Sequence, residues 1–121
     1  MSYTLTPSRP QKLHDAATVS AQGGILYIMG HCERLTVVVQ GTGTTSGGTI
    51  QIEEAYYDKD FGRDPVYGGT WSAVGAVINA STVTGGAQSV VHVVGSFWAV
   101  RVRIVTDITG GGSITVWAWG N

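Results

Sequence analysis

Short apolar runs separated by clusters of glycine constrain this chain more than any other feature. Valine and threonine are frequent in the runs, and many of the 18 glycines lie between them. β-Branched residues favour pleated strands, whereas paired glycines favour turns. No window repeats its apolar residues with the period of an amphipathic helix. We therefore predict strands near residues 16–20, 25–30, 34–40, 48–57, 71–78, 88–94, 97–106 and 113–119.

Short strands that follow one another about every ten residues are typical of a sandwich or barrel. The 121 residues of the chain have room for one domain. We predict an all-β fold, a two-sheet antiparallel sandwich of about eight strands that is jelly-roll-like, with an immunoglobulin-like sandwich as the alternative. Residues 1–15 contain two prolines and are predicted to form an extended N-terminal arm, which precedes a single β-sandwich domain at residues 16–121.

The surface of this protein is predicted to be poor in charge. Charged residues make up 12% of the chain, about half the usual share, and the formal net charge is −1. The basic residues are scattered, so we expect no nucleic-acid partner, because phosphate binding needs clustered Lys and Arg. A single cysteine, Cys32, cannot form an intrachain disulfide and fits synthesis in a reducing cytoplasm. No apolar stretch is long enough for a membrane span, so we expect no membrane partner.

The last two predicted strands carry aromatic and basic side chains. Alternation points Trp117 and Trp119 outward in the final strand, and Phe97, Arg101 and Arg103 outward in the strand before it. A hairpin between these strands would bring the indoles beside the guanidinium groups, which could then stack on them. Trp and Arg are enriched at interface hot spots, so we predict a protein interface on this face. The alternative is that the arm or a loop of the same chain covers it.

The predicted arm supplies further candidate interface residues. Such an arm is expected to be held in place either by its own sheet or by a neighbouring subunit, to which it would add contacts by strand addition or docking. These candidates are Tyr3, Leu5, Pro7 and Pro10.

An acidic loop follows the fourth predicted strand. Within residues 53–64, oxygen-bearing side chains alternate around Gly62, a pattern that matches part of a calcium loop; a solvated loop tip with local ion pairs is the alternative. Aromatic residues in and after this loop are candidate glycan contacts, or they close the end of the sandwich. These aromatic candidates are Tyr57, Tyr67 and Trp71.

Glu54 conflicts with the pattern of its strand. Alternation from Ile50 and Ile52 points its side chain into the core, where an unpaired carboxylate is costly. We therefore expect either a bulge in the strand or a position at the rim of the sheet.

Catalytic constellations are not visible in this sequence. Paired carboxylates, a nucleophile with a base in reach, and closely spaced Cys and His ligands do not occur at a spacing that supports chemistry. We therefore expect a protein that is not an enzyme and that uses no cofactor or metal for catalysis.

Several runs of the sequence together resemble one family of proteins. They are Leu35–Gly41, Gly48–Glu53, Thr70–Val74, Phe97–Ile104 and Gly111–Trp117. Over residues 33–119 the chain resembles small β-sandwich proteins of tailed bacteriophage particles, notably head-decoration (cement) proteins and related tail modules. The acidic loop at residues 53–65 is longer than the short turn expected there, which leaves its role open.

The resemblance implies a structural virion protein on the capsid surface that is synthesised in the host cytoplasm. Such a protein decorates and stabilises the capsid by binding subunits of the major capsid protein. The resemblance also implies a homo-oligomer, with a trimer favoured. A carbohydrate-binding or tail or fibre adhesion module is the alternative function, and head or tail location stays open.

Overall fold

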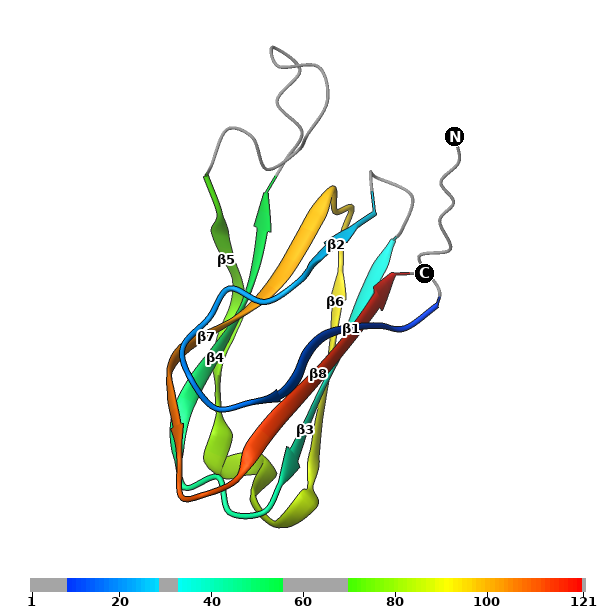
Figure 1. Ribbon diagram of the computed structural model, residues 1–121. Coiled ribbons are helices and arrows are strands. Elements are labelled where there is room, and N and C mark those ends of the chain that lie inside the picture. Colours follow the sequence, from blue (N-terminus) through cyan, green and yellow to red (C-terminus); the bar gives the residue numbers. More distant parts are fainter. Residues whose placement is uncertain (1–8, 29–32, 56–69, 121) are drawn as a thin grey trace.

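The computed structural model describes residues 9–28, 33–55 and 70–120, and these form an antiparallel β-sandwich (Figure 1). This confirms the predicted all-β fold, because the strands lie in two four-stranded sheets. The described residues contain no helix with the length and hydropathy to cross a membrane. The elements are β1 (Gln11–Ala17), β2 (Ile25–Tyr27), β3 (Arg34–Thr42), β4 (Gly47–Ala55), β5 (Ser72–Asn79), the 3-10 segment η1 (Ala80–Gly86), β6 (Gln88–Val94), β7 (Ala99–Thr109) and β8 (Ser113–Gly120).

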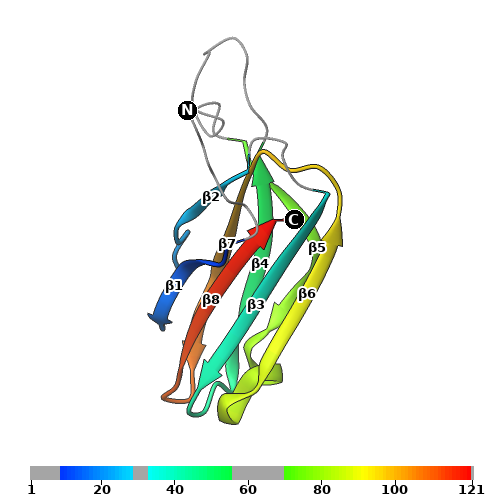
Figure 2. The same cartoon turned by 90° about the vertical axis from the view of Figure 1, so that its right-hand side faces the viewer.

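The two sheets are built from strands that are distant in the sequence. One sheet, which we call sheet A, has the order β1-β8-β3-β6, and the other, sheet B, has the order β2-β7-β4-β5. Figure 2 shows sheet A in front of sheet B. An immunoglobulin-like sandwich places its first two strands in one sheet. Here β1 and β2 lie in different sheets, so that alternative is wrong.

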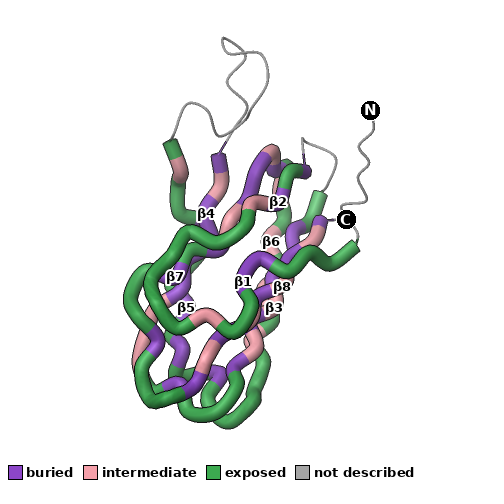
Figure 3. Tube along the Cα trace, viewed as in Figure 1, coloured by how far each residue is buried: buried purple, intermediate pink, exposed green. Residues whose placement is uncertain are grey.

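The core lies between the sheets and is built by alternating side chains. Figure 3 shows that buried residues lie mainly along the central strands and that exposed residues lie mainly along the borders of the sandwich. Aliphatic side chains dominate the interior, and central strands from both sheets contribute fully buried residues. These include Leu35, Val37, Val39, Ile50, Val100, Val102, Ile104, Ile114, Val116 and Ala118.

The N-terminal part of the sandwich differs from the prediction. Residues 11–15, which we assigned to the arm, belong to β1 and pair with β8. Register shifts on either side of His14 break the alternation, so that Leu13 and His14 are both buried. The pyrrolidine of Pro10 immediately precedes this strand, a position that a proline tolerates because it needs no ladder hydrogen bond there.

The expected outward position of Phe97 is also wrong. Phe97 is 3% exposed and belongs to the core cluster. Alternation does not extend to it because β7 begins at Ala99.

The predicted hairpin between β7 and β8 is wrong as well. The two strands lie in different sheets, so the connection after Thr109 crosses the sandwich. Its backbone bonds to the β3–β4 connection: the Ser46 amide donates to the Thr109 carbonyl, and the Gly112 amide donates to the Thr44 carbonyl. A side chain on Gly112 would begin 2.3 Å from the Thr42 carbonyl oxygen, so glycine allows this close approach.

Glu54 points inward and lies near the rim. It pairs with Val100, which is fully buried, and β4 ends one residue later. No register shift interrupts β4 between Ile52 and Ala55, so the rim alternative is correct and the bulge alternative is not. Among the described residues, the buried Oε1 atom of Glu54 has no hydrogen-bond partner.

Candidate functional site

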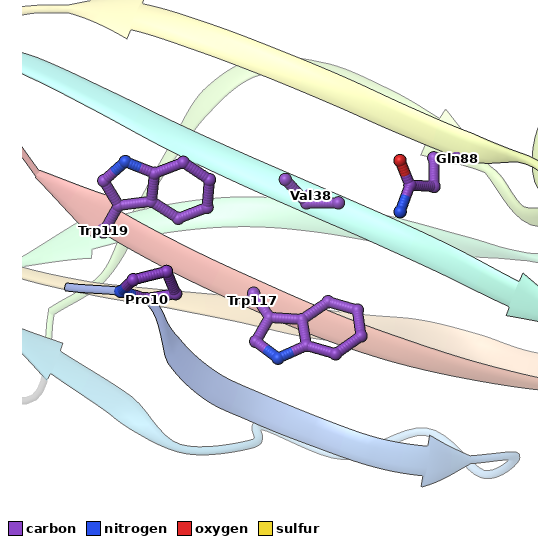
Figure 4. Close-up of a pocket in the computed structure, with 5 residues that line it drawn as sticks. All are labelled: Pro10, Val38, Gln88, Trp117 and Trp119. Atoms are coloured by element: carbon purple, nitrogen blue, oxygen red, sulfur yellow. The ribbon is translucent and has the colours of Figure 1, made fainter. Parts of the chain in front are cut away.

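The outer face of sheet A carries an apolar groove between two indoles. Trp117 and Trp119 project outward from β8 because the residues between and before them, Ala118 and Val116, face the core. Figure 4 shows both indoles on the same face of the sheet, with Pro10 beside them. The groove has a volume of about 310 Å³ and is lined by Pro10, Val38, Gln88, Trp117 and Trp119.

Neighbouring strands complete the surface around these indoles. Across the β3–β8 ladder, Val38 pairs with Trp117 and Thr36 pairs with Trp119. From the other side, Lys12 pairs with Trp117, and its ammonium lies 6.0 Å from the centre of the indole. This distance is the outer limit of a cation–π contact. Trp117 thus lies between β1 and β3, whereas Trp119 has a strand partner on β3 alone among the described residues, and both indoles are partly exposed to solvent.

The outer face of sheet B carries a different set of groups. Glu53 on β4 pairs with Arg101 on β7, and the Nε of Arg101 donates a 2.7 Å hydrogen bond to Glu53 Oε1. Both side chains are almost buried, at 11% exposed for Arg101 and 12% for Glu53. Arg103 reaches the second carboxylate oxygen at 3.9 Å and is much more exposed. Sheet B thus presents a shielded ion pair with one peripheral cation.

The shielding of this ion pair involves Trp71. The Arg101 guanidinium carbon lies 4.2 Å from the centre of the Trp71 indole, which is cation–π stacking. Next to the pair, the buried side chain of Gln51 donates through Nε2 to the carbonyls of Val74 and Gly75. The left-handed backbone of Gly75 lies within a register shift of β5 opposite β4.

The structure separates the residues that we predicted to share one face. Because β7 and β8 lie in different sheets, Trp117 and Trp119 point away from sheet A whereas Arg101 and Arg103 point away from sheet B. The expected stacking of an indole on a guanidinium does occur, but Trp71 provides the indole.

Other predicted site residues divide into two groups. Pro10 lies in the groove beside the two tryptophans. Residues 56–69 fall outside the described part of the chain, and so does the main part of the suggested calcium loop. Within the described ranges, no three His, Cys, Asp or Glu side chains gather as a metal site. The other predicted residues outside the description are Tyr3, Leu5, Pro7, Tyr57 and Tyr67.

Sequence reasoning did not identify Val38 and Gln88 as part of the groove. They come from β3 and β6, and only the strand order brings them beside β8. The role of Glu53 as the partner of Arg101 was also missed, although an acidic residue on the outward face of a strand was a usable signal.

Comparison with solved structures finds chains of similar fold. No protein-family model matches the chain, and no curated protein matches it in sequence. The SPBc2 prophage-derived protein YomS is similar over 97% of this chain and 96% of its own, with a TM-score of 0.54 and 21% identity. Weaker likenesses exist to proteins of two bee viruses. A chain of the Kashmir bee virus empty particle has a TM-score of 0.48 and 8% identity, over 99% of this chain and 93% of that one. A chain of the sacbrood virus of honeybee has a TM-score of 0.45 and 9% identity, over 92% and 88%.

Proposed function

We propose that this protein is a structural component of a phage or prophage particle, and that it decorates and stabilises a capsid by binding the major capsid protein. The observation that carries the proposal is the groove between Trp117 and Trp119 on the outer face of sheet A. Large aromatic side chains left partly open on a flat sheet face mark a surface that binds other protein.

Two further features support the particle context. Eight strands in two four-stranded sheets, with the orders β1-β8-β3-β6 and β2-β7-β4-β5, support the predicted jelly-roll-like arrangement. Jelly rolls are common in viral capsid domains. The prophage origin of YomS, whose fold is similar, suggests the same kind of source for this chain.

The groove is suited to an apolar anchor from the partner protein. Its walls are two indoles, its rim includes Pro10, and the amide of Gln88 offers a polar contact. Tryptophans at the centre of an interface commonly contribute about 2 kcal/mol or more. The contact therefore depends mainly on the two indoles, and charge contributes little.

Co-sedimentation with capsids tests the proposal. The wild-type protein should appear in the pellet with capsids assembled from the major capsid protein of the phage or prophage that encodes this chain. The double variant Trp117→Ala/Trp119→Ala should bind about 30-fold more weakly or worse, as the loss of about 2 kcal/mol requires. The fold should persist, because the core side chains of β8 point the other way.

A matched control uses the opposite sheet. Val77 on β5 is 50% exposed and lies far from the groove in the strand order, so Val77→Ser should bind capsids like the wild type. Absence of the wild-type protein from the capsid pellet at saturating concentration would refute the proposal. Equal losses for Val77→Ser and the tryptophan variant would refute the assignment of the surface.

Glycan binding by a tail or fibre module is the second candidate, and Trp71 is the described residue on which it depends. One face of this indole is occupied by Arg101, so a sugar ring would have to stack on the opposite face. A glycan array separates the two functions: a signal that Trp71→Ala abolishes, and that the groove variant keeps, would favour the adhesion module.

A further inference from the structure

The four sheet edges of this sandwich are not protected to the same degree. Exposed edge strands invite pairing with other chains, and proteins usually blunt them with bulges, charges or short length. In sheet A the edges are β1 and β6, and in sheet B they are β2 and β5.

Three of these edges carry such protection. β1 has two register shifts, the charged residues Lys12 and Asp15, and a left-handed backbone at Ala16. β2 has three residues. β5 is interrupted by a register shift and by the left-handed Gly75.

The fourth edge, β6, has none of these devices. Its sequence, Gln-Ser-Val-Val-His-Val-Val, contains no Asp, Glu, Lys or Arg, and it pairs with β3 over all seven residues without a register shift. Figure 2 shows β6 at the border of sheet A, with β3 on its inner side. Among the described strands, β3 is its sole partner.

Side chains on both faces of β6 are incompletely covered. Val90 is 51% exposed and Val94 is 84% exposed on the outer face. Val91 and Val93 pair with the fully buried Val37 and Leu35, so they face the interior. They nevertheless remain only partly buried. A neighbouring strand beyond β6 would cover both sets of valines.

The hydrogen-bond pattern fixes which backbone groups face this free edge. The Gly41 amide donates to the Ala87 carbonyl and the Gly95 amide donates to the Glu33 carbonyl, so these positions lie in hydrogen-bonded pairs of the β3–β6 ladder. Such pairs alternate along an antiparallel ladder. The amide and carbonyl groups directed away from β3 therefore belong to Gln88, Val90, His92 and Val94.

We infer that β6 pairs with β6 of a second copy of this chain, antiparallel about a two-fold axis at Val91. In this register the full length of both strands overlaps, and Val90 of each copy faces His92 of the other. Both residues direct their backbone groups toward the free edge, so they form a hydrogen-bonded pair, as do Gln88 and Val94. No acidic or basic pair opposes this contact, because β6 contains no Asp, Glu, Lys or Arg.

The product is a continuous eight-stranded sheet formed by sheet A of both copies. A two-fold axis perpendicular to this sheet keeps the two outer faces on the same side, so both tryptophan grooves point in one direction. A single strand pair is at the small end of protein interfaces, so we expect reversible association in the micromolar range. The trimer expected from the family resemblance does not follow from this edge, because a two-fold contact closes at two copies.

Two double variants with a shared substitution test the register. Val90→Lys/His92→Lys places lysines opposite each other across the axis and should yield the monomer mass of 12.7 kDa by sedimentation equilibrium. Val90→Lys/His92→Glu places opposite charges there and should retain the dimer. Both variants lose the hydrogen bond between His92 and Thr36, so they are matched in this respect. A monomeric or trimeric wild-type protein, or equal masses for the two variants, would overturn the inference.

Amide exchange provides an independent measurement on the wild-type chain. The amides of Val90 and His92 should exchange slowly at high protein concentration and quickly on dilution, whereas that of Val91, which faces β3, should stay protected throughout. Protection of Val90 and His92 at every dilution would show that another part of the same chain covers β6, and it would overturn the inference. Both measurements use the isolated protein, so their outcome does not depend on capsid binding.

Discussion

Arg101 is expected to be the most stabilising charged side chain among the described residues. Replacing it by Met removes the 2.7 Å bond to Glu53 and leaves that carboxylate almost buried, with Arg103 at 3.9 Å as its nearest cation. Breaking a buried pair from one side costs about 3–5 kcal/mol, and the remaining contact with Arg103 favours the lower end. We therefore expect Arg101→Met to lower the free energy of unfolding by about 3 kcal/mol.

The same geometry predicts a small effect for the second arginine. Arg103 is 46% exposed, so Arg103→Met should cost less than about 1 kcal/mol, as for surface ion pairs. The double variant Glu53→Met/Arg101→Met should lie within about 1 kcal/mol of the wild type, because it removes both charges and leaves neither unpaired.

Thermal and urea unfolding followed by circular dichroism measure these differences. For a domain of this size, about 3 kcal/mol corresponds to a fall in Tm of roughly 12 °C. The reasoning would be refuted if Arg101→Met cost less than about 1 kcal/mol, or if Arg103→Met cost as much as Arg101→Met.

Two further stability predictions concern positions inside the sandwich. Gly41→Ala should destabilise by about 2–3 kcal/mol, because the new carbon would begin 2.1 Å from the Val83 carbonyl oxygen. Gly111→Ala, which meets no atom within 4 Å, is the control and should cost about 1 kcal/mol of backbone strain; equal losses in urea unfolding would contradict the packing argument. His14→Ala should cost about 2–4 kcal/mol, because it empties a buried site and removes the hydrogen bond from the ring to the Val102 carbonyl. A Tm unchanged by His14→Ala would show that this bond contributes nothing.

The core of the central strands could be predicted from the sequence because burial there follows simple alternation. Val100, Val102 and Ile104 on β7, and Val116 and Ala118 on β8, are fully buried as the pattern indicates. β1 could not be predicted in this way, because its register shifts turn both Leu13 and His14 inward. The seven residues of this strand contain no sequence signal for such a shift.

The arrangement of the candidate site depended on information that local sequence does not contain. A run of three glycines at residues 110–112 is compatible with a hairpin and with a crossing between sheets, and the choice decides which side chains share a face. Here β7 and β8 each lie between two other strands, so neither has an edge left for the other. The predicted outward position of Trp117 and Trp119 was correct, whereas their predicted neighbours were wrong.

The position of β8 has a consequence for how the chain folds during synthesis. Residues 113–120 lie between β1 and β3, so sheet A lacks a central member until they have left the ribosome. Until then, the groups of β1 and β3 that pair with β8 remain open to other partners, as in any slowly completed β-protein. Completion of sheet A is therefore expected to wait until β8 is available, and the exposed strands can form wrong contacts in that interval.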